Sequence, residues 1–478
     1  MTYTSTRGDT TPLTSAETIV RGLALDGGLY VPSAIPTPDK LPSSAYDYNE
    51  HALWVMSHYF TDYTPEELSG CINAAYGAEN FDTPAVAPLV QTPSVAFLEL
   101  FHGRTLAFKD MALSLLPHLM TTALKKTGNK NTQVILTATS GDTGVSALEG
   151  FKDVPGTKII IFYPQDGVSV IQKQHMITQT GKNVSVIGVR GNFDDAQSEV
   201  KKIFLDKEVN AKINTDGYEF SSANSINTGR LVPQIVYYFY AYSQMIKGGM
   251  TRGDAVDFVV PTGNFGNILA GYYAKKMGLP ISTLVCASNE NRVLSDYFDT
   301  GVFDSDRPFY VTDSPSMDIL VPSNFERLVH DLADKAALQN LTEKKKFTMP
   351  VPSDFVGYYA TEKEMREAIK TMFTKHGYLI DPHTAVAYAA YVKKSTDSTK
   401  KDIILSTASP YKFPKTVMTS ISDKYEKYDD FALLEKMSEL TKRNIPTQFA
   451  DLQSKEILHP TTVDVSGMKD AVLNSVYS

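Results

Sequence analysis

The chain has 478 residues, of which 42% are hydrophobic and 21% charged, a composition typical of globular proteins with about two to four domains. Its net charge of −8, without a basic stripe interleaved with aromatic residues, argues against nucleic acid as the main partner. The first twenty residues lack an apolar run, and no later stretch approaches the ~18 apolar residues of a membrane span, so we expect no leader and no membrane segment. The two cysteines, Cys71 and Cys286, suit neither a disulfide framework nor a thiolate metal site, so a reducing cytoplasm is expected.

Residues 1–90 are predicted to form an N-terminal subdomain. A helical stretch around Ala16–Leu25 precedes a proline-rich passage at 31–42, and a second helical pattern lies near Tyr48–Phe60. The sequence contains no repeat of 20–50 residues, which disfavours a solenoid or a propeller.

Beyond about Leu100 the pattern changes to apolar, β-branched runs, each followed by a glycine-containing loop and a helical segment. This alternation predicts an α/β fold with parallel-rich sheets covered by helices. The clearest strands are expected at 133–139, 158–163, 184–189, 257–262 and 402–407.

These strands divide the rest of the chain into a first α/β half over 91–250, a second over 251–424, and a helical tail over 425–478. Five prolines interrupt the alternation at 289–354, which we interpret as a helical and loop-rich insertion. A Ser-, Thr- and Lys-rich turn is expected at 395–401, before the last strong strand.

The run Thr262–Asn267 follows an apolar strand and precedes a helix expected to begin near Ile268. Its glycines allow backbone N–H groups to converge at a helix N-terminus, so the loop suits a phosphate. The spacing matches neither GxGxxG nor the pattern ending in Gly-Lys-Ser/Thr, which disfavours a dinucleotide or a nucleoside triphosphate. A plain turn rich in Gly and Asn is the alternative interpretation.

A second loop of this kind, Ser140–Gly144, also lies between an apolar run and a helical segment, and it suits a carboxylate or a phosphate. Ser140 does not lie in a GxSxG pattern, so a hydrolase nucleophile is disfavoured. The alternative is that Thr139 or Ser140 caps the helix while Asp142 occupies its first turn.

Lys109 is a single lysine among apolar residues at the start of an apparent helix. A partly desolvated lysine has a lowered pKa and attacks carbonyl groups as an amine, although most isolated lysines are solvated surface groups. A phosphate loop, a second anion loop and such a lysine together suit a phosphorylated aldehyde bound as a Schiff base. Pyridoxal 5′-phosphate is that cofactor.

Ten motifs, taken together and in this order, resemble the bacterial and fungal branch of the threonine synthase family over nearly the whole chain. They are STRG at 5–8, GLALDGGLYVP at 22–32, ELFHGRTLAFKD at 99–110, TATSGDTG at 137–144, GNFDDAQ at 191–197, NSINTGR at 224–230, TGNFGN at 262–267, SPSMDIL at 314–320, DPHTAVAY at 381–388 and STASP at 406–410. The resemblance implies a fold type II pyridoxal enzyme, similar to the tryptophan synthase β chain, with two α/β halves around the cofactor and an extra N-terminal subdomain.

The resemblance also implies the roles of individual residues. Lys109 matches the catalytic lysine that forms the Schiff base, and Thr407 matches the hydroxyl residue that hydrogen-bonds the pyridine nitrogen. The residues that match the loop for the cofactor phosphate are Gly263, Asn264, Phe265, Gly266 and Asn267. The residues expected to meet the substrate carboxylate and the cofactor ring are Ser140, Gly141, Asp142 and Thr143, and those expected to meet the substrate phosphate are Asn227 and Arg230.

Three positions depart from the family pattern: Arg104 replaces a proline, Ser409 replaces a histidine, and Thr228 stands where an aromatic residue is frequent. His383 has two interpretations, an acid/base group or the first turn of a helix begun by Asp381 and Pro382. His102 and His175 have no carboxylate or second histidine at metal spacing, so no metal is assigned.

The activity that the resemblance implies is that of a lyase of threonine biosynthesis, which converts O-phospho-L-homoserine and water into L-threonine and phosphate. The substrate amine displaces Lys109, which then acts as a base at Cα and Cβ, phosphate leaves from Cγ, and water adds at Cβ. Closure of one half on the other would exclude bulk water until that last step.

Two alternatives are a phospho-lyase that releases ammonia and phosphate, and a non-catalytic protein that binds a phosphorylated metabolite. No nucleic acid, membrane or obligate protein partner is expected.

Overall fold

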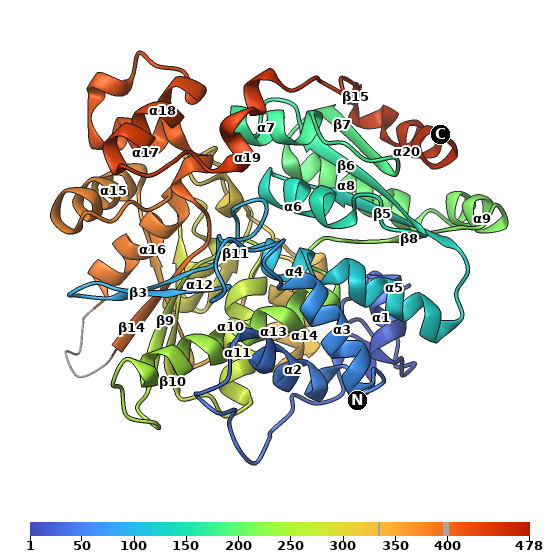
Figure 1. The fold of residues 1–478 in the computed structure, drawn as a ribbon. Helices are drawn as coiled ribbons and strands as arrows, with labels where there is room; N and C mark the ends of the chain where they lie inside the picture. The colour runs from blue at the N-terminus through green and yellow to red at the C-terminus, as the bar shows by residue number, and fades with distance from the viewer. Residues whose placement is uncertain (333–334, 395–400) are drawn as a thin grey trace.

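Two sheets form the framework of the computed structural model, which describes residues 1–332, 335–394 and 401–478 (Figure 1). The larger sheet has six strands, in the order β13 (Phe355–Tyr359), β10 (Ile281–Ser288), β9 (Val256–Pro261), β14 (Lys401–Ser406), β4 (Ala96–Glu99) and β3 (Leu89–Gln91). The smaller has five, in the order β15 (Thr462–Asp464), β7 (Val184–Arg190), β6 (Thr157–Pro164), β5 (Thr132–Ala138) and β8 (Tyr218–Ser221). Neighbouring strands are parallel except β3 and β4, which confirms the parallel-rich α/β fold.

Each of the five strongest apolar runs forms a strand within one residue of its expected position. Strand β9, for example, is buried along its whole length, because helices cover a parallel sheet on both faces. The expected turn at 395–401 lies outside the described residues except for Lys401, which begins β14.

Helices pack against both sheets, as the ribbon shows (Figure 1). Those on the smaller sheet side are α6 (Asp142–Phe151), α7 (Val170–Ile177), α8 (Phe193–Leu205), α9 (Lys207–Thr215) and α20 (Met468–Tyr477). Those on the larger sheet side are α10 (Thr228–Lys247), α11 (Gly266–Lys276), α12 (Val293–Thr300), α15 (Glu362–His376) and α16 (Pro382–Lys393). The short helix α4 (Asp110–Leu113) and the helix α5 (Leu116–Thr127) lead from the larger sheet into the smaller one.

The N-terminal region pairs β1 (Tyr3–Ser5) with β2 (Tyr30–Pro32) and adds three helices. Each helix begins with a capping box, in which an Asp or Thr side chain and a glutamate three residues later bond reciprocally to backbone N–H groups. These helices are α1 (Ser15–Arg21), α2 (Tyr48–Tyr59) and α3 (Pro65–Ala75). Helix α1 ends four residues earlier than expected, because Gly22 takes a φ of 71°.

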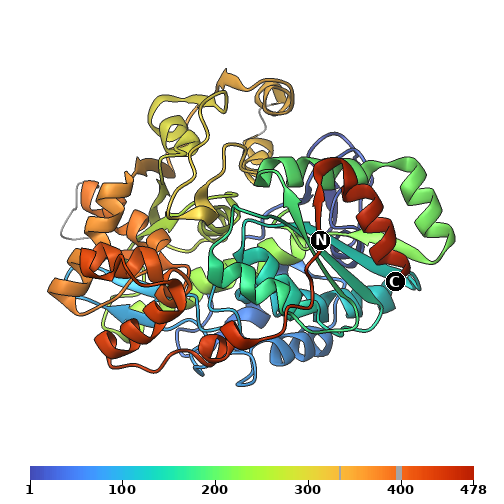
Figure 2. The same ribbon diagram turned by 90° about the horizontal axis from the view of Figure 1, so that it is seen from above.

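The expected insertion at 289–354 projects from the body of the molecule when it is seen from above (Figure 2). It contains α12, the antiparallel pair β11 (Val302–Asp304) and β12 (Lys346–Thr348), and the helices α13 (Phe325–Asp331) and α14 (Lys335–Glu343). Between β11 and α13 the chain forms a short 3-10 turn, η1 (Pro315–Met317).

Strand pairing crosses two of the expected domain boundaries. Residues 89–99 form β3 and β4, but β4 pairs with β14, so most of this segment, expected in the first half, belongs to the sheet of the second. The tail is not helical throughout, because its strand β15 pairs with β7 of the smaller sheet. Both pairings join segments about 270 residues or more apart, a separation that local sequence patterns do not encode.

The tail runs from one half of the molecule to the other (Figures 1 and 2). It follows α17 (Pro414–Ile421) on the larger sheet side and passes through α18 (Asp430–Thr441) and α19 (Thr447–Ala450) before it reaches β15 and α20. This connection ties the two halves together.

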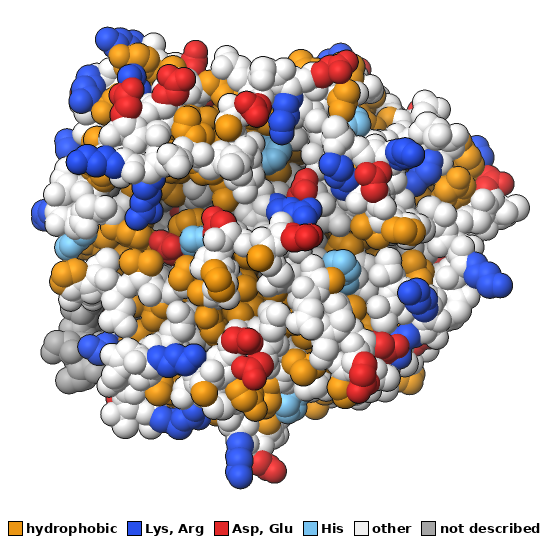
Figure 3. Space-filling model, in the orientation of Figure 1, with side chains coloured by type: hydrophobic (Ala, Val, Ile, Leu, Met, Phe, Trp, Pro, Cys, Tyr) orange, Lys and Arg blue, Asp and Glu red, His pale blue; other side chains and the backbone are white. Residues whose placement is uncertain are grey.

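Charged side chains of both signs are interspersed over the face shown in Figure 3, without a large area of one sign. In the described part of the chain, no helix combines the length and hydropathy that crossing a membrane requires.

Helix α10 is the central helix of the larger half and is buried along nearly its whole length. A close approach of α11 to it depends on Gly271, where a Cβ atom would lie 2.7 Å from the ring of Tyr238. The same atom would lie 2.9 Å from Leu284 of β10, so neither neighbour leaves room for a methyl group.

We predict that Gly271→Ala lowers the free energy of unfolding by about 1–3 kcal/mol, since overpacking displaces α11 from α10 and β10. Gly70→Ala is the matched control: Gly70 lies inside α3, and a Cβ atom there would meet no other atom within 4 Å, so alanine raises stability by about 0.5–1 kcal/mol. Thermal and urea unfolding of both variants measures the two effects. Equal midpoints for the two variants would contradict the tight α10–α11 contact.

Candidate active site

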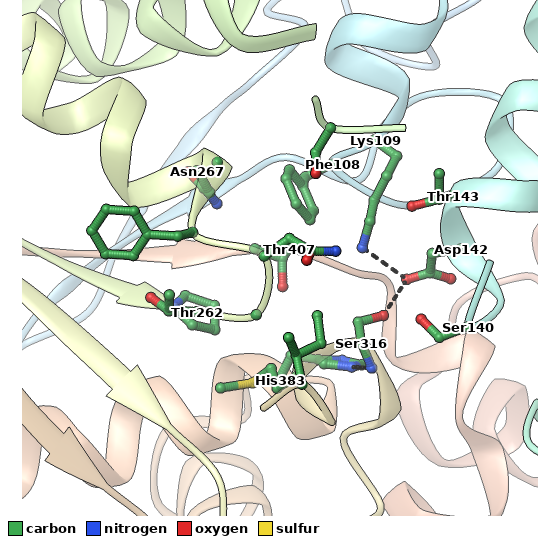
Figure 4. Close-up of a pocket in the computed structure, with 18 of the residues that line it drawn as sticks. Phe108, Lys109, Ser140, Asp142, Thr143, Thr262, Asn267, Ser316, His383 and Thr407 are labelled. Atoms are coloured by element: carbon green, nitrogen blue, oxygen red, sulfur yellow. Dashed lines mark hydrogen bonds and ion pairs between the residues drawn. The ribbon is translucent and has the colours of Figure 1, made fainter. Parts of the chain in front are cut away.

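A cavity lies where loops that follow β5, β9 and β14 meet (Figure 4). In parallel α/β sheets, ligands bind outside the carboxyl ends of strands, because the following helix N-termini and loops converge there. All predicted site residues except Gly141 and Asn227 line this cavity: Lys109, Ser140, Asp142, Thr143, Arg230, Gly263, Asn264, Phe265, Gly266, Asn267 and Thr407. The fold thus brings together residues from separate parts of the sequence.

Lys109 reaches the cavity from the N-cap position of α4, and its side chain is only 10% exposed. Its Nζ lies 3.9 Å from Oδ2 of Asp142 and 4.4 Å from the ring centroid of Phe108. Burial lowers the pKa of Lys109 to about 8, with Asp142 acting in the opposite direction and Arg230 in the same one. Lys109 therefore loses its proton much more readily near neutral pH than an ordinary lysine does.

Asp142 begins α6 and is 2% exposed. Burial raises its pKa, but the positive charges of Lys412 and Lys109 outweigh burial and hold the pKa of Asp142 well below its usual range. The second anion loop thus contributes a permanent carboxylate to the cavity wall, directed toward Lys109 (Figure 4).

The backbone around Asp142 is organised by Thr139, whose Oγ1 accepts hydrogen bonds from the N–H groups of Gly141 (3.0 Å) and Gly144 (2.7 Å). Gly141 is the N-cap of α6, with a φ of 130° that favours glycine, and lies outside the cavity lining. The expectation that Thr139 or Ser140 caps the helix is wrong, because the N-cap is Gly141, although Asp142 does occupy the first turn. Ser140 lines the cavity.

The loop Gly263–Asn267 forms the opposite wall and runs into α11, which begins at Gly266, two residues before the expected position. Phe265 has a φ of 65°, and its buried ring packs against Phe298, Phe325 and Phe355, so its main chain is the part that faces the cavity. A Cβ at Gly263 would lie 2.3 Å from the carbonyl oxygen of Ser316, so only glycine permits this close approach.

Asn267 carries a buried amide whose oxygen is fully engaged. Its Oδ1 accepts hydrogen bonds from the hydroxyl groups of Tyr237 (2.6 Å) and Tyr238 (3.1 Å) of α10. These bonds orient the amide, while Nδ2 is buried without a hydrogen-bond partner. A buried donor left without a partner costs free energy, so this side chain is prepared for an acceptor in the cavity.

Arg230 lines the cavity from the first turn of α10 and is 3% exposed. Its Nη1 donates to the carbonyl oxygen of Ala223 (2.9 Å), and its Nε has no partner. Burial lowers the pKa of Arg230 to about 10, which leaves it charged near neutral pH.

Asn227, the other candidate for the substrate phosphate, does not line the cavity, contrary to expectation. Its Nδ2 donates to the carbonyl oxygens of Ile19 and Ser222, both at 3.0 Å, and its Oδ1 accepts from the N–H of Gly229. Asn227 therefore caps α10 and binds α1, and no polar atom of its side chain remains for a ligand.

Three further lining residues, to which sequence reasoning assigned no site role, come from the insertion: Ser316, Met317 and Ile319. All three belong to the SPSMDIL motif of the insertion, whose presence among the family motifs was the available signal. Ser316 Oγ lies 3.4 Å from Oδ2 of Asp142, so the insertion connects the two halves across the cavity (Figure 4).

His383 satisfies both of its interpretations in part. It lies in the first turn of α16, whose N-cap is Asp381, which confirms the helix start. Its ring also lines the cavity, with Nδ1 2.6 Å from Oδ2 of Asp381 and Nε2 accepting from the N–H of Ser316 (3.2 Å). This arrangement requires the neutral tautomer with its proton on Nδ1.

The three departures from the family pattern lie away from the cavity lining. Arg104 binds the carbonyl oxygen of Glu79 and the carboxylate of Glu149 on an exposed surface. Thr228 contacts Thr18 of α1, and Ser409 caps the 3-10 turn η2 (Pro410–Lys412). None of the three side chains is therefore placed to contact a ligand in the cavity.

His102 does have carboxylate neighbours, contrary to expectation. Asp82 Oδ1 lies 2.6 Å from its Nδ1 and Glu99 Oε2 lies 2.8 Å from its Nε2. Burial lowers the pKa of His102, but these two bonds outweigh it and raise the pKa to about 9. Among the residues that the structure describes, no group of three or more His, Cys, Asp or Glu side chains is arranged to hold a metal ion.

Family models match three successive parts of the chain. Residues 2–76 match "Threonine synthase N terminus", residues 81–409 match "Pyridoxal-phosphate dependent enzyme", and residues 384–461 match "Threonine synthase, C-terminal". The cavity residues all lie within the second of these matches.

The cavity fits pyridoxal phosphate on its own chemistry. Lys109 supplies a buried amine for the aldehyde, and the N-terminus of α11 with the unpartnered Nδ2 of Asn267 supplies donors for the phosphate. Thr407 follows β14 and lines the cavity, and its hydroxyl group is the neutral partner expected for the ring nitrogen.

Known proteins are similar to this chain over nearly its full length. A threonine synthase of Schizosaccharomyces pombe is 38% identical over 481 residues, covering 90% of each chain. "Threonine synthase-like 1" of Homo sapiens is 38% identical over 437 residues, which are 86% of this chain and 58% of that longer protein. The crystal structure of threonine synthase with bound pyridoxal phosphate from Brucella melitensis superposes with a TM-score of 0.85 at 34% identity, covering all of both chains. The chain thus has fold type II and belongs to the threonine synthase family of pyridoxal-phosphate-dependent enzymes.

Proposed function

We propose that the chain converts O-phospho-L-homoserine and water into L-threonine and inorganic phosphate. The observation that carries this proposal is the buried amine of Lys109 facing the phosphate loop Gly263–Asn267 across one cavity. Membership of the threonine synthase family supports the same reaction.

Pyridoxal phosphate, when bound, supplies an electron sink for negative charge that develops on substrate carbon atoms. The chain supplies the base: Lys109 Nζ accepts protons from substrate carbons and returns them, a role suited to an amine with a pKa of about 8. Arg230, with Nε free and its charge retained, holds the substrate phosphate as it leaves. Ser316 and His383 position the insertion as a cover that limits access of water to the cavity.

The residue roles and the division of the chain into domains stay predictions. Location in the cytoplasm and the lack of an obligate protein partner also stay predictions, made from the sequence alone.

We predict that the cofactor-loaded protein releases L-threonine and phosphate from O-phospho-L-homoserine in equal amounts. Amino-acid analysis and a phosphate assay measure both products. Release of 2-oxobutyrate with ammonia would instead support a phospho-lyase, and binding without any product would support a metabolite-binding protein.

We predict that Lys109→Ala removes both turnover and the visible absorption of the cofactor-loaded protein, because the amine that holds the cofactor and moves protons is lost. The fall in kcat should be at least about 10²–10⁴-fold, the usual contribution of a positioned base. Lys126→Ala, which removes a surface lysine paired with Glu67, is the control and should keep both signals. A coloured and active Lys109→Ala protein would overturn the assignment.

We predict that Asn267→Asp weakens cofactor binding by about tenfold or more, as expected for losing a hydrogen bond to a charged group. Aspartate retains an oxygen for Tyr237 and Tyr238 but replaces the free Nδ2 donor with a negative charge. Equilibrium dialysis of pyridoxal phosphate measures the effect, and Asn214→Asp on the exposed surface of α9 is the control. An unchanged dissociation constant would remove Asn267 from the phosphate subsite.

A further inference from the structure

Lys412 is a buried lysine behind the cavity wall that no step above uses. It lies at the end of η2, and its side chain is 2% exposed. Its Nζ donates to the carbonyl oxygen of Thr105 (2.6 Å) and lies 3.0 Å from Oδ1 of Asp142. Burying an ammonium group without a partner costs free energy, so these two contacts hold the charge of Lys412 between Thr105 and Asp142.

Asp142 lies between two lysines and offers a different oxygen to each. Oδ1 faces Lys412 and accepts a hydrogen bond from Nε2 of Gln172 (2.7 Å). Oδ2 faces the cavity, 3.9 Å from Nζ of Lys109 and 3.4 Å from Oγ of Ser316. The shorter ion pair is therefore the one with Lys412, on the side away from the reacting groups.

This arrangement decides what happens when Lys109 loses its proton. If Lys109 were the only cation near Asp142, deprotonation would leave a buried carboxylate without a counter-charge, which is strongly unfavourable. With Lys412 in place, Asp142 keeps a paired charge whether Lys109 is an ammonium or an amine.

The charges that face Lys109 come from four elements. Asp142 of α6 and Asp381 before α16 favour its ammonium form, whereas Arg230 of α10 and Lys412 of η2 disfavour it. Asp381 is already engaged by Nδ1 of His383, and the nearby His175 is kept neutral by burial, which lowers its pKa to about 3. Lys412 is therefore the cation that offsets Asp142 most directly.

Lys412 also holds together the two segments that carry these groups. The carbonyl oxygen that it binds belongs to Thr105, whose N–H and Oγ1 donate to the carboxylate of Asp110 (2.8 and 2.6 Å). Asp110 follows Lys109 directly in the chain. One ammonium group thus fixes both the loop of Asp142 and the approach to Lys109.

We propose that Lys412 is a positioning residue that keeps Asp142 as a paired anion and so allows Lys109 to act as a neutral amine. The inference rests on the proposed role of Lys109 as the reactive amine. The inference concerns the charge state of the Lys109 amine in the cofactor-free chain, so a measurement without turnover can test it.

The test measures the protonation midpoint of Lys109 in the full-length chain freed of cofactor. Trace acetylation with acetic anhydride at a series of pH values, followed by mass spectrometry of the Lys109 peptide, reports the fraction of neutral amine. Lys412→Met removes the charge and keeps an apolar stem. Loss of the neighbouring cation, with Asp142 left to pair with Lys109 alone, should raise the midpoint by about one unit, so that acetylation near neutral pH slows about tenfold.

Three further variants separate charge from structure. Lys412→Arg keeps the charge and should keep the wild-type midpoint. Asp142→Asn removes the anion while Lys412 stays, so the midpoint should fall rather than rise. Lys394→Met removes a partly buried lysine, paired with Asp257 and Asp402 away from the cavity, and should leave the midpoint unchanged.

Opposite shifts in Lys412→Met and Asp142→Asn support the proposal, whereas a folded Lys412→Met protein with the wild-type midpoint overturns it. If Lys412→Met does not fold, Lys412→Gln takes its place, since it also removes the charge but keeps a donor for the carbonyl oxygen of Thr105: a higher midpoint supports the proposal, and an unchanged one overturns it. The result is independent of the product assay, because acetylation requires no substrate. If the wild-type chain makes threonine but the midpoint of Lys109 does not move in the variants, only the proposed role of Lys412 is refuted.

Discussion

The ionisation of one buried amine is the constraint on which the rest of the site depends. Lys109 must be sheltered from water to lose its proton near neutral pH, yet a buried amine needs neighbours that stabilise it in both charge states. Asp142 stabilises the ammonium form, while Arg230 and Lys412 offset that effect. Burial and these two cations therefore act together against the ammonium form, and Asp142 opposes them. This cluster lies within a chain whose net charge is −8. The positive potential needed for an anionic substrate is concentrated at this cavity.

The two-sheet architecture supplies these groups from different directions. The loop after β5 carries Asp142, the loop after β9 carries Gly263–Asn267, and the residue after β14 is Thr407. None of these segments could form the cavity by itself, because each contributes one wall. The insertion closes the fourth side through Ser316, which contacts both Asp142 and His383.

Helix α10 packs in the core of the larger half and also contributes residues to the cavity. Its first turn presents Arg230 to the cavity, and two of its tyrosines orient the amide of Asn267 on the neighbouring helix α11. The close contact of these helices at Gly271 keeps that orientation fixed. Packing deep in the larger half thus determines where the unpartnered Nδ2 of Asn267 points.

The sequence by itself determined the elements that depend on local physics. Strands such as β9 followed from continuous apolar runs, helix starts from capping residues such as Asp381, and the phosphate loop from glycines at a strand-to-helix junction. Lys109 stood out through its combination with two anion loops and through the family motif around it, because an isolated lysine is usually a solvated surface group. Only the tertiary structure decided that Asn227 binds the backbone of α1, that β4 joins the second half, and that Lys412 lies against Asp142. Each of these depends on contacts between residues distant in the chain, whose geometry arises only when the two sheets pack together.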